Sequence, residues 1–272
     1  MALSPDGRRL ALIAYDPDNK STFVWMEDLS TGTGSRRTFG EKSFTDGAWS
    51  KDGKLLAYAT NEGAIYTQPS DGSAPPALLY AGEMQSYPSS WSPDGKVLAV
   101  NVSSIPNFDI YLLPLSGEKK LIPFIGGPGW KMSGSFSPDR KWFAYSSDES
   151  GRSEVYVVPY PGPGGKLQVS AGGGQVPNWL NGGRELAYVN GDRKLMVAQL
   201  SGGGQQLQVG QTRNIFGGRP LPVMPADVFT GQTAPPVYMT PDGKRVVLVV
   251  PNDLDAVKPL NLITNWTAGL KK

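Results

Sequence analysis

The stretch SPDGRRLAL, residues 4–12, joins a tight-turn motif to an apolar run. In its first four residues, proline presets φ to about −65° at the second turn position, and glycine accepts the positive φ of the fourth. The apolar run that follows is short and has a turn signal in front of it, which is typical of a β-strand buried on both faces. The stretch therefore predicts a turn that leads into a buried strand.

Five further copies of this turn-and-strand pattern follow along the chain. They are SKDGKLLAY from Ser50, SPDGKVLAV from Ser92, SPDRKWFAY from Ser137, LNGGRELAY from Leu180 and TPDGKRVVL from Thr240. The first five copies start 42 to 46 residues apart, and the last copy starts 60 residues after the fifth. A period in the low forties with several strands per repeat is typical of β-propeller blades.

Each repeat also supplies the other strands of a blade. An aromatic residue stands directly before four of the turns, as Trp49, Trp91, Phe136 and Trp179, and we expect these rings to be buried between neighbouring blades. A second apolar run, such as FDIYLLPLSG, and a weaker third run, such as GKLQVSAGG, complete each repeat. We therefore predict an all-β, six-bladed β-propeller of four-stranded antiparallel blades. It forms one domain over residues 1–272, with repeats at about 1–40, 41–82, 83–127, 128–173, 174–218 and 219–272.

The two ends of the chain do not complete this pattern. Only three residues precede Ser4, and only TAGLKK follows the last predicted strand, residues 260–266. We expect the first inner strand and the last outer strand to be truncated, and the natural chain to begin further upstream. The open edge of the last blade could then pair with a second copy to form a homodimer.

Composition narrows the class of partner. The chain has 34 glycines and 24 prolines, but 39% of its residues are hydrophobic, so it is rich in turns and still able to fold. The formal net charge is +2, and the basic pairs are scattered over different repeats, which argues against a nucleic-acid partner. The sequence shows neither a signal peptide nor a long apolar run, and we expect no membrane insertion by this chain.

The chain contains no histidine and no cysteine. A Ser-His-Asp or Cys-His catalytic unit and a zinc site of histidines and cysteines are therefore excluded. The remaining chemistry is that of oxygen ligands around a hard cation, or of carboxylates whose pKa is shifted by their surroundings.

Two repeats carry a resemblance to a known family. The stretches SPDGKVLAV…FDIYLLPLSG from Ser92 and SPDRKWFAYSSDESGRSEVYVVPYPGPGGKLQVSAGGG from Ser137 resemble the TolB-like propeller repeat. The second stretch and the ending ITNWTAGLKK are similar to the propeller that follows the kinase domain in many soil-bacterial serine/threonine kinases. The resemblance implies a sensor or protein-binding part of a larger bacterial protein, on the extracytoplasmic side, and it brings no catalytic motif. The turns KDG, PDR and NGG depart from the family's PDG and should be weaker.

We name the strands of a blade A to D from the inside outwards. In this arrangement the B–C loops and the D–A connections open on one face around the channel, and loops at such a mouth are the default binding site. Asp46 and Asn178 begin inner strands, while Asp148 and Glu149 lie in a B–C loop. Hydrogen bonds to backbone or buried water are the favoured interpretation of Asp46 and Asn178. The alternative is a Ca²⁺ site on Asp46 and Asn178, with Asp46, Asp148 and Glu149 as catalytic carboxylates.

Two function hypotheses follow. The favoured one is a module that binds a protein segment or a small ligand at the loop face. The other is a hydrolase of esters, lactones or phosphotriesters that uses a divalent cation at the channel mouth.

Two further segments have alternative interpretations. The stretch from Asp16 to Asn19 forms half of a calcium-loop pattern, and a solvated turn is its favoured interpretation. The Pro-rich insertion from Arg213 is predicted either as a lid or rim contact or as a filler loop.

Overall fold

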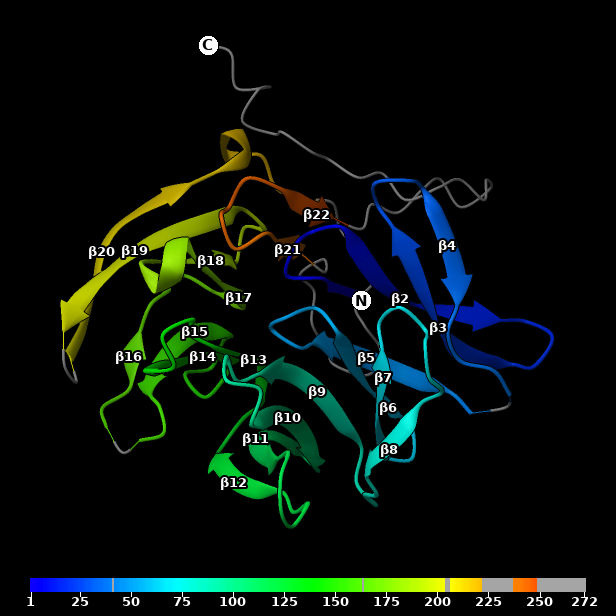
Figure 1. The fold of residues 1–272 in the computed structure, drawn as a ribbon. Helices are drawn as coiled ribbons and strands as arrows, with labels where there is room; N and C mark the ends of the chain where they lie inside the picture. The colour runs from blue at the N-terminus through cyan, green and yellow to red at the C-terminus, as the bar shows by residue number, and fades with distance from the viewer. Residues whose placement is uncertain (41, 163, 204–205, 222–236, 249–272) are drawn as a thin grey trace. The chain divides into compact units, whose positions relative to one another are not determined.

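The computed structural model describes residues 1–40, 42–162, 164–203, 206–221 and 237–248 (Figure 1). The chain folds into two compact units, Met1–Phe136 and Ser137–Lys272. Apart from two short 3-10 turns, Asn181–Gly183 and Phe216–Gly218, every regular element in the described ranges is a β-strand. None of the described segments is a helix with the length and hydropathy of a membrane span.

The first unit contains three four-stranded antiparallel sheets, in each of which the order of strands in space is their order in the sequence. The first sheet has β1 (Ala2–Leu3), β2 (Arg9–Asp16), β3 (Ser21–Asp28) and β4 (Thr33–Arg36). The second has β5 (Phe44–Trp49), β6 (Leu55–Thr60), β7 (Ile65–Pro69) and β8 (Ala77–Tyr80). The third has β9 (Ser86–Trp91), β10 (Val97–Ser104), β11 (Asn107–Pro114) and β12 (Ile122–Ile125). The unit ends with β13 (Lys131–Phe136), the first strand of the fourth sheet.

The second unit continues the same arrangement. The fourth sheet goes on with β14 (Trp142–Ser147), β15 (Glu154–Pro159) and β16 (Leu167–Gln168). The fifth sheet has β17 (Gln175–Leu180), β18 (Glu185–Val189), β19 (Leu195–Gly203) and β20 (Gln206–Asn214). The described part of the sixth is the antiparallel pair β21 (Val237–Met239) and β22 (Val246–Leu248).

The succession of sheets confirms the predicted all-β class with four-stranded antiparallel blades. The first inner strand is short, as expected, since β1 has two residues. The predicted strand at residues 260–266, with the open edge and the homodimer expected from it, lies outside the described residues. Residues 222–236 of the Pro-rich insertion lie outside them too.

The serine and aspartate of the recurring motif make the same hydrogen bonds in successive turns. The Ser4 hydroxyl donates to Asp6 Oδ1 (2.6 Å) and accepts from the N–H of Arg9 (2.9 Å). The same hydroxyl–carboxylate bond joins Ser50 to Asp52, Ser92 to Asp94, Ser137 to Asp139 and Thr240 to Asp242. The copies at Ser50 and Ser137, which lack the proline and the glycine respectively, are among them, so neither residue is required for this bond. The fifth copy has neither the serine nor the aspartate, and it forms the 3-10 turn Asn181–Gly183.

The residue after the aspartate has a left-handed backbone in these turns. Gly7, Gly53, Gly95 and Gly243 have φ between 65° and 69°. In the fourth repeat the same place is taken by Arg140, with φ of 63°. A residue with a Cβ is strained in this conformation, whereas glycine is not.

Replacing Arg140 by glycine is therefore expected to raise the free energy of unfolding by about 1 kcal/mol. The reverse exchange, Gly95→Arg, should lower it by a similar amount. Urea unfolding followed by circular dichroism measures both. A less stable Arg140→Gly protein would mean that the arginine side chain contributes more than its backbone strain costs.

The aromatic residues before the turns link successive blades. Trp49 and Trp91 are 8% and 9% exposed. The indole Nε1 of Trp49 donates to the carbonyl of Ala2 (3.0 Å), and that of Trp91 donates to the carbonyl of Ala48 (2.9 Å). Ala2 and Ala48 occupy the same place, two residues before the turn serine, so each ring reaches the inner strand of the preceding sheet. Phe136 and Trp179 are also buried, and the predicted burial of these rings is confirmed.

Candidate functional site

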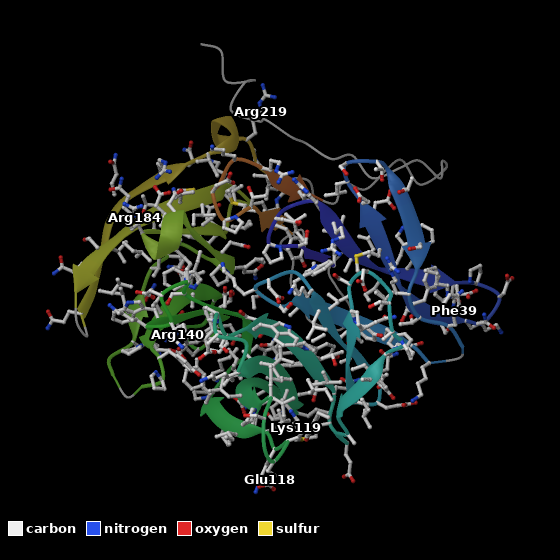
Figure 2. All side chains as sticks on the ribbon, in the orientation of Figure 1. Phe39, Glu118, Lys119, Arg140, Arg184 and Arg219 are labelled. Atoms are coloured by element: carbon white, nitrogen blue, oxygen red, sulfur yellow. The ribbon has the colours of Figure 1, made fainter. Side chains whose placement is uncertain are left out.

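The ends of the sheets in the first unit differ in the side chains they expose. Because the strands are antiparallel, the B–C loops and the D–A connections lie at one end of each sheet, which we call the loop end. The A–B turns and the C–D hairpins lie at the other end, the turn end. Among the described residues, the exposed large apolar side chains are Tyr15, Phe39, Met84 and Ile105 in or next to the loops of the loop end, and Leu78 and Ile122 at the starts of outer strands, next to C–D hairpins. Exposed residues at the turn end include the charged Glu118 and Lys119 (Figure 2).

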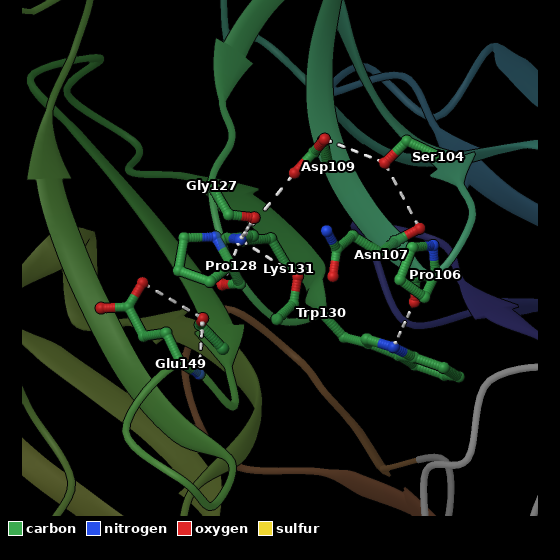
Figure 3. A network of polar contacts seen from close by, with 11 residues as sticks. Ser104, Pro106, Asn107, Asp109, Gly127, Pro128, Trp130, Lys131 and Glu149 are labelled. Carbon is green, nitrogen blue, oxygen red and sulfur yellow. Dashed lines mark hydrogen bonds and ion pairs between the residues drawn. The ribbon is translucent and has the colours of Figure 1, made fainter.

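Ile105 is the most exposed of these side chains, at 90%. It lies in the short turn between β10 and β11, next to a cluster of aromatic side chains. Figure 3 shows the contact between this turn and Trp130. The indole Nε1 of Trp130 donates to the carbonyl of Pro106 (2.9 Å), and the rings of Trp130 and Phe108 are 5.1 Å apart. Phe108 in turn contacts the buried ring of Tyr87 at 6.0 Å. The apolar tip is therefore presented on a firmly packed base.

A fully buried lysine shapes the neighbouring D–A connection (Figure 3). Lys131 Nζ donates to the carbonyls of Gly127, Pro128 (2.6 Å) and Gly129 (3.0 Å). It also lies 3.8 Å from Asp109 Oδ1, while Asp109 Oδ2 accepts from the Ser104 hydroxyl (2.9 Å). An ammonium group has three N–H donors, and here three carbonyls receive them. Lys131 is therefore a structural residue, not a nucleophile.

Sequence reasoning missed Lys131 and Asp109. The signal of Lys131 in the sequence is weak. It is a lysine that directly follows the glycine-rich stretch GGPGW and takes the first position of an inner strand. A lysine at the start of a strand, next to a loop, is usually a solvated side chain. Only the wrapping of the loop around the ammonium group reveals its role.

The predicted site residues have different surroundings. Asp46 lies in β5, and its side chain lies outside the described part of the chain. Asn178, in β17, donates from Nδ2 to the carbonyl of Val176 (2.8 Å), as in the favoured backbone-bonded interpretation. Asp148 is exposed in the loop after β14. Glu149 accepts hydrogen bonds from Lys166 Nζ and from the Ser147 hydroxyl (3.4 Å).

The four predicted residues are divided between the two units. Asp46 belongs to the first unit, and Asp148, Glu149 and Asn178 belong to the second. Within the ranges that the structure describes, no three acidic side chains are grouped in a way that could hold a metal ion. The Ca²⁺ site and the catalytic carboxylates stay predictions.

The calcium-like stretch from Asp16 to Asn19 forms a hydrogen-bonded turn. Asp16 Oδ1 accepts from the N–H of Asp18 (3.1 Å), and Oδ2 accepts from Asn19 Nδ2 (3.0 Å) and from Arg36 Nη1 (2.6 Å). The Arg36 guanidinium lies over the ring of Phe23, 4.1 Å from its centroid. Both carboxylate oxygens of Asp16 are thus engaged by donors of the protein, which supports the favoured turn interpretation.

These bonds make the contribution of Asp16 to stability depend on pH. Hydrogen bonds from Asn19, and then from Arg36, lower the pKa of Asp16 to about 2. Its pKa in an unfolded chain is about 3.9, so the contribution is fully present above about pH 4 and is lost as the pH falls through about 2. We expect the stability difference between wild type and Asp16→Asn, measured by urea unfolding, to shrink from pH 5 to pH 2. Asp18→Asn, an exposed control in the same turn, should show no such trend.

The second unit contains a cavity of about 180 Å³ between the loops of its first two sheets. Its lining comes from the loop β14–β15 (Arg152 and Ser153), the connection β16–β17 (residues 172–175) and the loop β18–β19 (Asn190, Gly191 and Arg193). These are B–C loops and a D–A connection, the classes of loop that the sequence predicts as the binding site. The lining contains two arginines and no acidic residue.

Buried polar groups hold the walls of this cavity. The carboxylate of Glu154, which is 1% exposed, accepts from the N–H groups of Gly172 (3.1 Å) and Gly173 (2.9 Å) and from Arg152 Nε (2.7 Å). Asn190 Oδ1 accepts from the N–H of Lys194 (2.8 Å). The two loops on either side are therefore set by side chain–backbone bonds.

Comparisons with known proteins identify the fold. No family model matches the sequence. An uncharacterized protein of Agrobacterium fabrum (strain C58) is 28% identical over 205 residues, which are 70% of this chain and 64% of that protein. An uncharacterized peptidase of Bacillus subtilis (strain 168) is 33% identical over 108 residues, which are 37% of this chain and 16% of the peptidase. The matches thus span less than two thirds of the length of either relative.

Among solved structures, TolB from Acinetobacter baumannii superposes with a TM-score of 0.69 at 21% identity. The match covers 90% of this chain and 59% of TolB. A likeness at this identity concerns the fold and leaves function open. The predicted relation to the propellers of serine/threonine kinases stays a prediction. The chain has the fold of a TolB-like β-propeller.

Proposed function

We propose that this chain is a protein-binding module that recognises a protein segment through the loop end of its first unit. The observation that carries the proposal is the distribution of exposed large apolar side chains: four of the six in the described ranges lie in or next to the loops of that end, and the other two, Leu78 and Ile122, lie at the starts of outer strands after C–D hairpins. Exposed apolar side chains that gather on one surface mark interaction sites, whereas scattered ones need no explanation. A propeller fold is consistent with such a module.

The support under Ile105 favours binding over incidental exposure. Trp130 and Phe108 fix the turn from below, so little conformational freedom is lost when a partner covers the tip. Buried aromatic and apolar anchors supply most of the energy of protein interfaces. We further propose that the module is the sensor or interaction part of a larger bacterial protein on the extracytoplasmic side, as the family resemblance implies.

The test is a selection of displayed peptides against the purified protein, followed by affinity measurement with variants. We expect Ile105→Ser and Met84→Ser each to weaken the selected peptides about tenfold or more, as expected for an anchor residue. The matched controls are Leu78→Ser and Ile122→Ser, which remove exposed apolar side chains from outer strands of the same unit. Circular dichroism checks that all four proteins are folded.

Two results would contradict the proposal. One is a selection that enriches no peptide, and the other is binding that all four variants weaken equally. Turnover of activated esters that disappears with a chelator and in Asp46→Ala would support the cation-dependent hydrolase in its place.

A further inference from the structure

We infer that the cavity between the loops of the second unit binds a carboxylate group of a protein segment. This inference rests on the proposed function for the source of the carboxylate, but it concerns a different set of residues. Four observations support it: the two arginines of the lining, the hydrogen bonds of the buried Glu154 behind them, the backbone conformation of Arg193 and the close contact between the loops that form the walls.

Arg152 and Arg193 have N–H groups to offer a ligand. Arg152 uses Nε for Glu154, and its side chain is 64% exposed. Arg193 uses Nη1 for the carbonyl of Leu221 (3.1 Å). Within the described part of the chain, the other guanidinium nitrogens of these two residues make no hydrogen bond. A guanidinium presents paired N–H donors whose geometry matches the two oxygens of a carboxylate.

The buried acid behind the wall pairs with Arg152, and one net positive charge remains on Arg152, Arg193 and Glu154 together. Glu154 is buried, and four donors of the protein satisfy its carboxylate: Ser170 Oγ, the N–H groups of Gly172 and Gly173, and Arg152 Nε. The ion pair with Arg152 also orients that guanidinium. The cavity therefore has cationic groups at its surface and a saturated carboxylate beneath it.

The backbone of Arg193 has a conformation that glycine adopts in the equivalent loops. In three B–C loops the same hydrogen bond closes the turn, from Gly63 N to Thr60 O, from Gly151 N to Asp148 O and from Arg193 N to Asn190 O. The donor residue is left-handed each time, with φ of 94°, 91° and 60°. Glycine accepts this conformation without strain, but arginine does not. Strained residues that the surrounding structure maintains cluster at ligand sites.

The walls leave room for a small group and cannot easily move. A Cβ on Gly173 would lie 2.7 Å from the nitrogen of Gly191, so the two loops touch backbone to backbone. A Cβ on Gly174 would lie 2.3 Å from Ser170 Oγ. The volume of about 180 Å³ suits a carboxylate with a few adjoining atoms.

The experiment is a titration of ¹⁵N-labelled protein, followed by NMR, with three probes. Acetyl-Gly-Gly carries a chain-terminal carboxylate, acetyl-Gly-Glu-amide carries a side-chain carboxylate, and acetyl-Gly-Gln-amide is neutral. We expect the amide signals of residues 172–174 and 191 to shift with at least one carboxylate probe and not with the neutral one. The probe that binds more tightly distinguishes a chain terminus from an acidic side chain.

Variants assign the binding to the arginines. Arg152→Gln and Arg193→Gln should each weaken the carboxylate probe about tenfold, the effect of one charge-assisted contact. Arg184→Gln is the matched control, since Arg184 is an exposed arginine of the same sheet on the turn at the opposite end of β18 (Figure 2). If Arg193→Gln does not fold, Arg193→Gly replaces it, because glycine suits the backbone and should weaken binding about tenfold without loss of stability.

Shifts that are equal with the neutral probe, or binding that Arg152→Gln and Arg193→Gly leave intact, would overturn the inference. Selected peptides that still bind to these variants, but not to Ile105→Ser, would overturn it and leave the proposed function standing. Carboxylate probes that bind while no displayed peptide is enriched would overturn the protein segment as the source of the carboxylate.

Discussion

Truncation of Trp91 to alanine is expected to lower the free energy of unfolding by about 3 to 5 kcal/mol, as for other large aromatic side chains in cores. The ring packs in a cluster that includes Ala48 and Ala57 of the second sheet and Leu98 and Val100 of the third. Its removal would leave a cavity between two sheets that both rely on it. It would also leave the carbonyl of Ala48 without its indole donor.

Urea unfolding of Trp91→Ala and Trp91→Phe separates the two contributions. Phenylalanine keeps most of the buried surface but removes the hydrogen bond to Ala48. Trp91→Phe should therefore lower the free energy of unfolding by less than Trp91→Ala does, by about 1 to 3 kcal/mol. Trp49, which makes the equivalent bond to Ala2, should behave in the same way. An unchanged unfolding midpoint for Trp91→Ala would show that the ring is exposed and that the register of the blades is wrong.

Replacement of Lys131 by methionine is expected to lower the free energy of unfolding by about 3 kcal/mol or more. Methionine has a similar length, but it cannot donate to the carbonyls of Gly127, Pro128 and Gly129. A buried acceptor left without a donor costs about 1 to 3 kcal/mol. The connection between β12 and β13 contains Trp130, which supports the turn of Ile105. This connection would also lose the ammonium group that its carbonyls bind.

Thermal and urea unfolding measure this effect, with Lys96→Met as the control. Lys96 is exposed at a turn of the same unit, so its exchange should change stability by less than about 0.5 kcal/mol. Asp109→Asn should cost much less than Lys131→Met, because Asp109 Oδ1 lies 3.8 Å from the ammonium, beyond hydrogen-bond distance. Equal stability of Lys131→Met and Lys96→Met would contradict the structural role of the buried ammonium.

Much of the fold could be predicted from the sequence. The turn motif repeats at nearly constant spacing, and each copy is followed by an apolar run of strand length, so local preference and periodicity agree with one another. The burial of Trp49 and Trp91 follows from their constant place before the turn. The hydrogen bond from the Ser4 hydroxyl to Asp6 is likewise local, since it joins residues two apart in the chain.

For the candidate sites, the sequence could predict which kinds of loop form them, but not which residues. The sequence predicts that B–C loops and D–A connections form the binding face, and the cavity of the second unit lies among them. The residues singled out for chemistry were acidic ones, because the chain has no histidine or cysteine. The contacts that stand out in the structure involve basic and apolar residues instead, namely Arg152, Arg193, Lys131 and Ile105.

The sequence by itself determined the class of fold, the number of repeats and the places of the turns and buried rings. These features depend on contacts within a repeat or on its regular return, and both can be read along the chain. Tertiary structure alone decided that Lys131 is buried while Ile105 is exposed, and that Gly173 meets Gly191 to wall a cavity. Burial, desolvation and the pairing of charges depend on groups from distant parts of the chain, and no local pattern in the sequence records which of them will meet.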